Sequence, residues 1–136
     1  MGSETCKNMV IFYKIYYIFY FIYFTCMPFI INIGSMSAER REAGSSLYVA
    51  TKSAVQGFTE SLRKEVNQDG IRVALIEPGA VGTDLNDLPP EKQRQMEAEL
   101  KMLKAEDIAN YIYFILTEPQ RVDVIVGEIR PHLQII

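Results

Sequence analysis

Short apolar runs alternate with longer amphipathic stretches along most of this chain. Residues 28–33 and 71–76 are short apolar runs, which predict buried strands. Helices are predicted over 46–66, from residue 91 onward and over 105–117, and a third strand is predicted over 122–129. Strands that alternate with helices favour an α/β fold with a parallel sheet.

The predicted helix over 46–66 has a regular apolar pattern. The apolar positions keep helical spacing until the polar residues 67–70 end the helix. We therefore expect one buried stripe, formed by Leu47, Ala50, Ala54, Val55, Phe58 and Leu62. The segment before it, residues 36–44, carries charges of both signs and is expected to be a solvated loop.

Residues 9–27 differ from everything that follows. They are rich in Phe, Tyr and Ile, and no charged residue occurs from Ile15 to Ile33. Such a stretch is expected to be helical over roughly 8–26, and about 19 residues of helix match the thickness of a bilayer core. Against a membrane anchor, Pro28 would break the helix, and tyrosine prefers the membrane interface to its centre.

Other interpretations of this segment also follow from its residues. It lacks the small residues of a signal-peptide cleavage site, and Cys6 stands where a myristoylation start needs serine or threonine. The segment has no periodic polar face, which indicates that it did not evolve as the surface of a water-soluble protein. A truncated gene read from a wrong start would produce such a segment. Residues 1–27 are accordingly separated from a domain over 28–136, and a membrane anchor remains the alternative.

Composition restricts the function classes. The chain has 136 residues and a net charge of −3, which suit one globular domain and do not suggest a nucleic-acid partner. Cys6 and Cys26 have no nearby histidine or second cysteine pair, so neither a zinc site nor a disulfide framework is supported. A reducing, cytoplasmic location is expected, with membrane anchoring as the alternative. His132 is the single histidine and is expected to be an ordinary, partly exposed side chain.

Tyr48 and Lys52 are the first candidate catalytic residues. Four residues apart on a helix, they leave the same face about 6 Å apart. A cation near a tyrosine stabilises its phenolate, so the pair suits proton exchange with a ligand. Ser35, after the first strand, is placed to hydrogen-bond a substrate oxygen. The spacing alone also arises by chance, since the chain has eight tyrosines.

The order of these features resembles the short-chain dehydrogenase/reductase family. A strand, Ser35, a Gly-Ser-Ser helix start and then Tyr48 and Lys52 follow one another, with thirteen residues from the serine to the tyrosine. The resemblance implies a doubly wound, Rossmann-like parallel sheet. It also implies hydride transfer between NAD or NADP and an alcohol or carbonyl substrate. Tyr48 would be the acid/base, Lys52 would bind the nicotinamide ribose, and Ser35 would hold the substrate oxygen.

A second stretch, Pro78-Gly-Ala-Val-Gly-Thr83, resembles the family motif Pro-Gly-x-Val-x-Thr. The resemblance implies that Pro78, Gly79, Val81 and Thr83 contact the nicotinamide end of the cofactor. A Pro-Gly turn at the carboxyl edge of a parallel sheet is also where ligands bind in open α/β folds. Residues 84–103 correspond to the variable substrate lid of the family and do not identify a substrate.

Several family motifs are absent from this sequence. It has no glycine-rich dinucleotide fingerprint, no Asn-Asn-Ala-Gly element and no catalytic asparagine. Asn32 does not replace that asparagine, because it lies in the strand leading to Ser35. The resemblance thus covers the C-terminal half of a family member, over residues 28–136, with an incomplete cofactor site. The alternative function is a non-catalytic membrane-associated or subunit-interaction fragment, and homo-oligomerisation is expected of the full-length family member.

Overall fold

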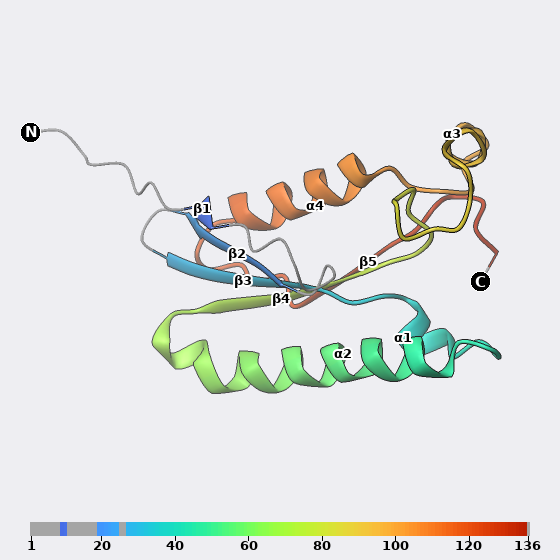
Figure 1. The fold of residues 1–136 in the computed structure, drawn as a ribbon. Coiled ribbons are helices and arrows are strands. Elements are labelled where there is room, and N and C mark those ends of the chain that lie inside the picture. Colours follow the sequence, from blue (N-terminus) through green and yellow to red (C-terminus); the bar gives the residue numbers. More distant parts are fainter. Residues whose placement is uncertain (1–8, 11–18, 25–26, 136) are drawn as a thin grey trace, which may run out of the picture.

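In the computed structural model, a sheet lies between two helical layers (Figure 1). The structure describes residues 9–10, 19–24 and 27–135. Helix α4 (Ala105–Thr117) covers one face of the sheet, and helix α2 (Ser46–Val66) covers the other. The layered α/β architecture expected from the alternating pattern is therefore confirmed.

The sheet combines parallel and antiparallel pairing. Its strand order is β1-β2-β3-β4-β5. The pairs β3–β4 and β4–β5 are parallel, whereas the pairs β1–β2 and β2–β3 are antiparallel. Helix α2 connects β3 to its parallel neighbour β4, as a βαβ unit requires. The strands are β1 (Met9–Val10), β2 (Phe19–Phe24), β3 (Met27–Ile33), β4 (Arg72–Pro78) and β5 (Val126–Ile129).

The predicted N-terminal helix is wrong where the structure describes it. Phe19–Phe24 forms strand β2 and pairs along β3 from Phe19 opposite Asn32 to Phe24 opposite Met27. Aromatic residues and isoleucine fit a pleated strand, and the edge of β3 offers unpaired backbone groups. Residues 11–18 and 25–26, which the helix prediction also covered, lie outside the described residues. Within the parts that are described, no helix is both long and apolar enough to cross a membrane.

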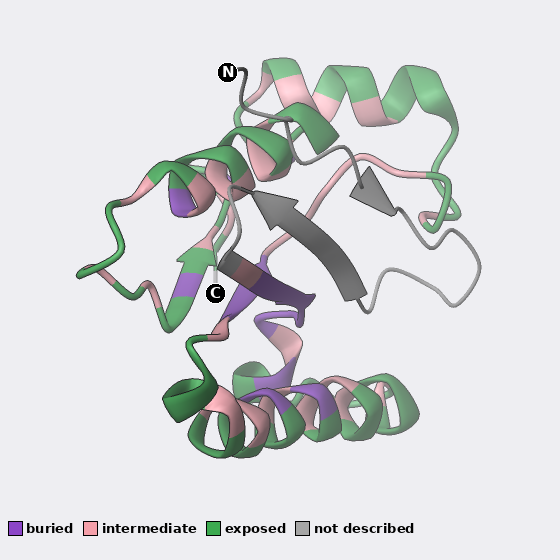
Figure 2. Cartoon of the chain, turned by 90° about the vertical axis from the view of Figure 1, so that its left-hand side faces the viewer, coloured by how far each residue is buried: buried purple, intermediate pink, exposed green. Residues whose placement is uncertain are grey.

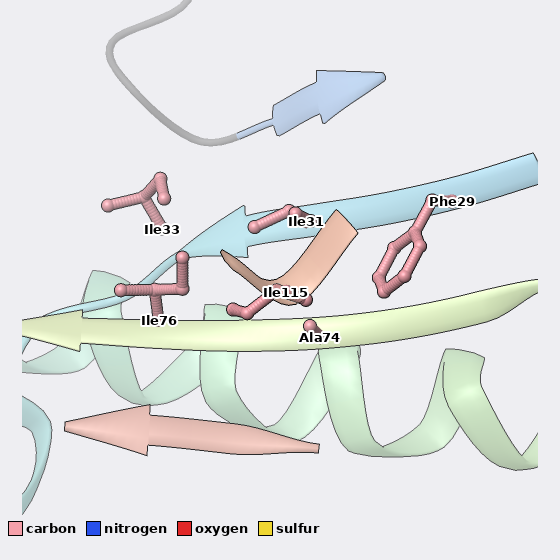
Figure 3. Packing of buried hydrophobic residues seen from close by; sticks show 6 residues of the cluster. All are labelled: Phe29, Ile31, Ile33, Ala74, Ile76 and Ile115. Atoms are coloured by element: carbon pink, nitrogen blue, oxygen red, sulfur yellow. The ribbon is translucent and has the colours of Figure 1, made fainter. Parts of the chain in front are cut away.

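The core lies between the parallel strands and α4. Figure 3 shows side chains of β3 and β4 around Ile115 of α4. Figure 2 shows that the buried residues lie mainly in β3 and β4, whereas β5 has one buried residue. Isoleucines at alternate positions of β3 point to one face, as the period of two in a strand requires. The buried cluster consists of Phe29, Ile31, Ile33, Ala74, Ile76 and Ile115.

Helix α2 begins and ends where predicted, but its buried stripe differs. Val55 and Thr59 are buried, while Leu47 is 82% exposed and Phe58 is 49% exposed. Ala50 and Ala54 are also exposed. The predicted apolar positions therefore do not form a single buried stripe. The face of the helix with Val55 and Thr59 packs on the sheet, whereas Leu47 and Phe58 are exposed.

The remaining elements are short. Helix α1 (Ser37–Arg40) forms in the segment expected to be a loop, and it buries Ala38 completely. The 3-10 turn η1 (Asn67–Asp69) ends α2, and Gly70 follows in the left-handed region with φ of 75°. Helix α3 (Pro90–Ala98) begins at a proline, as predicted. Strand β5 begins at Val126, four residues after the predicted start.

Candidate active site

A cavity of about 540 Å³ opens at the carboxyl ends of β3 and β4. Its volume lies within the usual range for small-molecule sites. The loop after β3, the start of α2, the turn after β4 and α4 all contribute to its walls. The structure brings together on this cavity all seven residues that the sequence singled out, namely Ser35, Tyr48, Lys52, Pro78, Gly79, Val81 and Thr83.

Ser35 is held at the end of β3 by backbone hydrogen bonds to β4. The amide of Gly34 donates to the carbonyl of Ile76 at 2.7 Å, and the amide of Met36 donates to the carbonyl of Pro78 at 3.1 Å. The Ser35 Oγ accepts a hydrogen bond from the Ser37 amide at 3.2 Å, at the start of α1. The serine is therefore fixed on the sheet, although it belongs to a loop.

Tyr48 and Lys52 lie on one face of α2, as their spacing predicts. The Lys52 Nζ lies 5.8 Å from the centre of the Tyr48 ring and donates a hydrogen bond to the Ile33 carbonyl at 3.1 Å. Tyr48 is half exposed, whereas the ammonium group is partly buried, and this burial lowers the pKa of Lys52 below its ordinary value of 10.5. A fixed cation thus lies beside a phenol that a ligand can reach.

The turn after β4 forms the opposite wall. The Gly79 amide donates to the Ile129 carbonyl at 2.8 Å, which attaches the turn to β5. Further along, the Gly82 amide donates to the Leu103 carbonyl at 2.8 Å. The Asn86 Nδ2 donates to the Val81 carbonyl at 2.6 Å. These bonds fix the backbone of the segment that carries Val81 and Thr83.

Sequence reasoning did not assign the other residues of the cavity wall, among them Arg40 and Gln134. Arg40 lines the cavity from α1, and Gln134 lines it from the C-terminal segment. Arg40 was assigned to a solvated loop because mixed charges usually indicate one. Gln134 has no sequence signal, since its place depends on the fold of a segment far from the motifs. Asn32 is not among the residues that line the cavity, and its Nδ2 donates to Thr59 Oγ1 at 2.8 Å.

Glu77 is a buried carboxylic acid next to the site. It precedes Pro78 in β4 and is 2% exposed, and its Oε1 has no hydrogen-bond partner among the described residues. Burial, together with the charges of Glu39 and Glu128, raises the pKa of Glu77 to about 7 from its ordinary value of 4.5. A carboxylate in an apolar strand directly before Pro-Gly was the signal that sequence reasoning did not use.

Comparisons with known proteins agree with this geometry. The sequence profile of the short chain dehydrogenase family matches residues 29–94. Human dehydrogenase/reductase SDR family member 11 is 38% identical over 114 residues, covering 78% of this chain and 44% of the human protein. A short-chain dehydrogenase from Burkholderia cenocepacia, solved in complex with NADP, has 32% identity and a TM-score of 0.63, with 76% of this chain and 44% of that chain covered.

A third relative is the closed form of a serine dehydrogenase solved with NADP+. It has 30% identity and a TM-score of 0.62, and the similarity covers 74% of this chain and 43% of that chain. The fold and the cavity at the strand ends define a Rossmann-like α/β protein. The chain belongs to the short-chain dehydrogenase/reductase family, and it spans less than half of the length of the relatives it matches.

Proposed function

We propose that this chain carries the substrate end of an NAD(P)-dependent oxidoreductase site, as a truncated part of a longer family domain. The proposed reaction moves a hydride between a nicotinamide cofactor and an alcohol or carbonyl carbon. The observation that supports it best is the convergence of three segments on one cavity: the loop with Ser35, the helix with Tyr48 and Lys52, and the turn from Pro78 to Thr83.

The residues of the cavity suit the nicotinamide end of such a cofactor. Pro78 and Val81 supply apolar surface for a flat ring, and the Thr83 hydroxyl supplies a polar group nearby. The Lys52 ammonium suits the hydroxyls of a ribose, since it presents several hydrogen-bond donors. When bound, the cofactor supplies or accepts the hydride. Relatives solved with NADP or NADP+ favour a nicotinamide dinucleotide and leave the choice between NAD and NADP open.

The roles proposed for the protein groups follow from their positions. Tyr48 exchanges a proton with the substrate oxygen, because its exposed hydroxyl is the group that a ligand in the cavity reaches. Lys52 stabilises negative charge on the phenolate oxygen from beside the ring, and Ser35 donates a hydrogen bond to the same substrate oxygen. Preorganisation supports these roles, since the Ile33 carbonyl holds Lys52 and the α1 amide holds Ser35.

Replacement of Tyr48 by phenylalanine tests this proposal. In a chain completed with the N-terminal half of a family member, Tyr48→Phe should lower turnover of a small ketone about 100-fold or more, because the acid/base is lost. Tyr113→Phe is the matched control, since Tyr113 is 66% exposed on α4 and does not line the cavity. Equal turnover in the Tyr48→Phe and Tyr113→Phe proteins would refute the assignment.

A further inference from the structure

The C-terminal segment that follows β5 is attached to the candidate site. The Leu133 amide donates to the Leu100 carbonyl at 2.9 Å, and the Arg130 Nη1 donates to the Gln134 carbonyl at 2.8 Å. Pro131 is buried, and the backbone N–H of Gln134 donates a hydrogen bond to the Pro131 carbonyl at 3.2 Å. These hydrogen bonds place Gln134 at the cavity independently of its side-chain contacts.

The side chain of Gln134 packs on the turn after β4. Its Oε1 accepts a hydrogen bond from the Ala80 amide at 3.0 Å. A Cβ placed on Gly79 would lie 2.2 Å from this oxygen and 3.0 Å from the Cβ of Arg130. The absence of a side chain at position 79 thus allows the glutamine to lie directly against the backbone of the turn.

The contact with Ala80 also fixes the orientation of the carboxamide. A backbone N–H donates and does not accept, so the atom that faces it must be the oxygen of the glutamine. The amino group, Nε2, is then the other arm of the same plane, with two N–H donors. In the part of the chain that the structure describes, no residue accepts a hydrogen bond from Nε2.

We propose that Gln134 is a specificity-determining residue, whose Nε2 donates a hydrogen bond to a second oxygen of the substrate. The inference rests on the proposed function, because it assumes that the substrate occupies this cavity. The preferred substrates carry an acceptor, such as a carboxylate, at a distance from the reacting carbonyl. Ala80 positions the glutamine, and the glutamine selects the ligand.

Nuclear magnetic resonance titration of the 136-residue chain tests this inference without turnover. The probes are levulinate (4-oxopentanoate) and 2-pentanone, which share the methyl ketone, while only levulinate carries a carboxylate. Levulinate should shift the side-chain amide signals of Gln134 and bind about tenfold more tightly than 2-pentanone, as a charge-assisted hydrogen bond predicts. Unmoved Gln134 signals at saturating levulinate would overturn the proposal.

Two variants separate anchoring from selection. Gln134→Glu keeps an oxygen for the Ala80 amide but removes the donor, so Ala80 exchange should stay slow while the preference for levulinate is lost. Gln134→Leu loses both contacts, so Ala80 exchange should also become about fivefold faster. A preference that survives both variants and disappears in Arg40→Gln would overturn the proposal, because Arg40 would then be the selecting group.

The outcomes for the subsite and for the proposed function can be distinguished. If Tyr48→Phe abolishes turnover in the completed chain while Gln134→Glu leaves the preference for levulinate unchanged, only the subsite is refuted. If Gln134→Glu removes the preference while Tyr48→Phe leaves turnover unchanged, the binding subsite stands and the catalytic assignment fails.

Discussion

The two faces of β3 and β4 differ in polarity, although the same strands form both. Toward α4, the buried side chains of the strands are all apolar, and Ile115 packs among them without exposure. The charged residue on this face is Arg72 at the start of β4, whose guanidinium lies 4.4 Å from the centre of the Phe29 ring. Toward α2, the strands bury two polar side chains, Asn32 and Glu77, beside apolar neighbours such as Leu75. The Nδ2 of Asn32 donates to Thr59 of α2, but the Asn32 Oδ1 and the Glu77 Oε1 both lack a hydrogen-bond partner within the described structure.

The α4 face mainly stabilises the fold, whereas the α2 face positions the helix that carries the candidate catalytic residues. The buried cluster on the α4 face gains free energy from apolar burial, which is not directional. On the α2 face, buried polar groups need fixed partners, so they set the position of the helix that carries Tyr48 and Lys52. Glu77 lies between the two site segments, because Gly34 packs against it and Pro78 follows it in the chain. We therefore expect the two faces to respond differently to substitution and to pH.

The largest effect is expected on the apolar face. Ile115→Ala should lower the free energy of unfolding by about 4 kcal/mol, since the removed methyl groups leave a cavity in a fully buried cluster. Ile125→Ala is the matched control and should cost less than about 1 kcal/mol, because Ile125 is 44% exposed and lies outside the buried cluster. Urea unfolding at one pH measures both values. Equal losses would mean that the cluster around Ile115 is not the principal core.

The second effect is a pH dependence on the polar face. The pKa of Glu77 is raised from 4.5 to about 7, so the folded chain binds a proton that the unfolded chain releases. The contribution of Glu77 to the free energy of unfolding is therefore fully present below pH 4.5, and it is lost as the pH rises to about 7. The loss should approach about 3 kcal/mol, since one pKa unit corresponds to about 1.4 kcal/mol.

Glu77→Gln should remove this contribution and make the chain more stable than the unsubstituted protein at pH 8. Glu128→Gln removes one neighbouring negative charge, so it should lower the pKa of Glu77. The loss of stability with rising pH should then be slightly smaller than in the unsubstituted protein. Urea unfolding between pH 5 and pH 8 measures the slope, provided that the same series is run for all three proteins. An identical slope in Glu77→Gln would show that another group titrates.

The sequence predicted the parallel part of the fold because each of its elements has a local signal. Period and turn residues define β3, α2, β4 and α4, and their bounds agree with the structure within about two residues. The face of α2 could not be predicted in this way, since a helix with two apolar stripes does not show which one meets the sheet. The N-terminal helix was predicted from apolar length, whereas a neighbouring strand edge decided the structure of Phe19–Phe24.

The candidate site was predictable to the same degree and for the same reason. Tyr48, Lys52 and the turn from Pro78 to Thr83 belong to motifs that are contiguous in sequence, so their order carries information. Gln134 reaches the cavity because the neighbouring Leu133 amide donates to the Leu100 carbonyl and because its own side-chain oxygen accepts from the Ala80 amide, and both partners are distant in the chain. The pKa of Glu77 is raised first by burial and then by the charges of Glu39 and Glu128, and all three causes exist only in the folded state. Such contacts have no local pattern.

The smallest effect is expected for the hydrogen bond between the polar face and α2. Thr59→Val leaves the Nδ2 of buried Asn32 without its acceptor, which should cost about 1 to 2 kcal/mol. Asn32→Val together with Thr59→Val removes both polar partners, so the double variant should be less destabilised than the sum of the single ones. Urea unfolding of the four proteins gives the coupling free energy directly. Strict additivity would mean that the 2.8 Å contact does not hold α2 to β3, and the register of Tyr48 and Lys52 over the cavity would then depend on apolar contacts such as Val55.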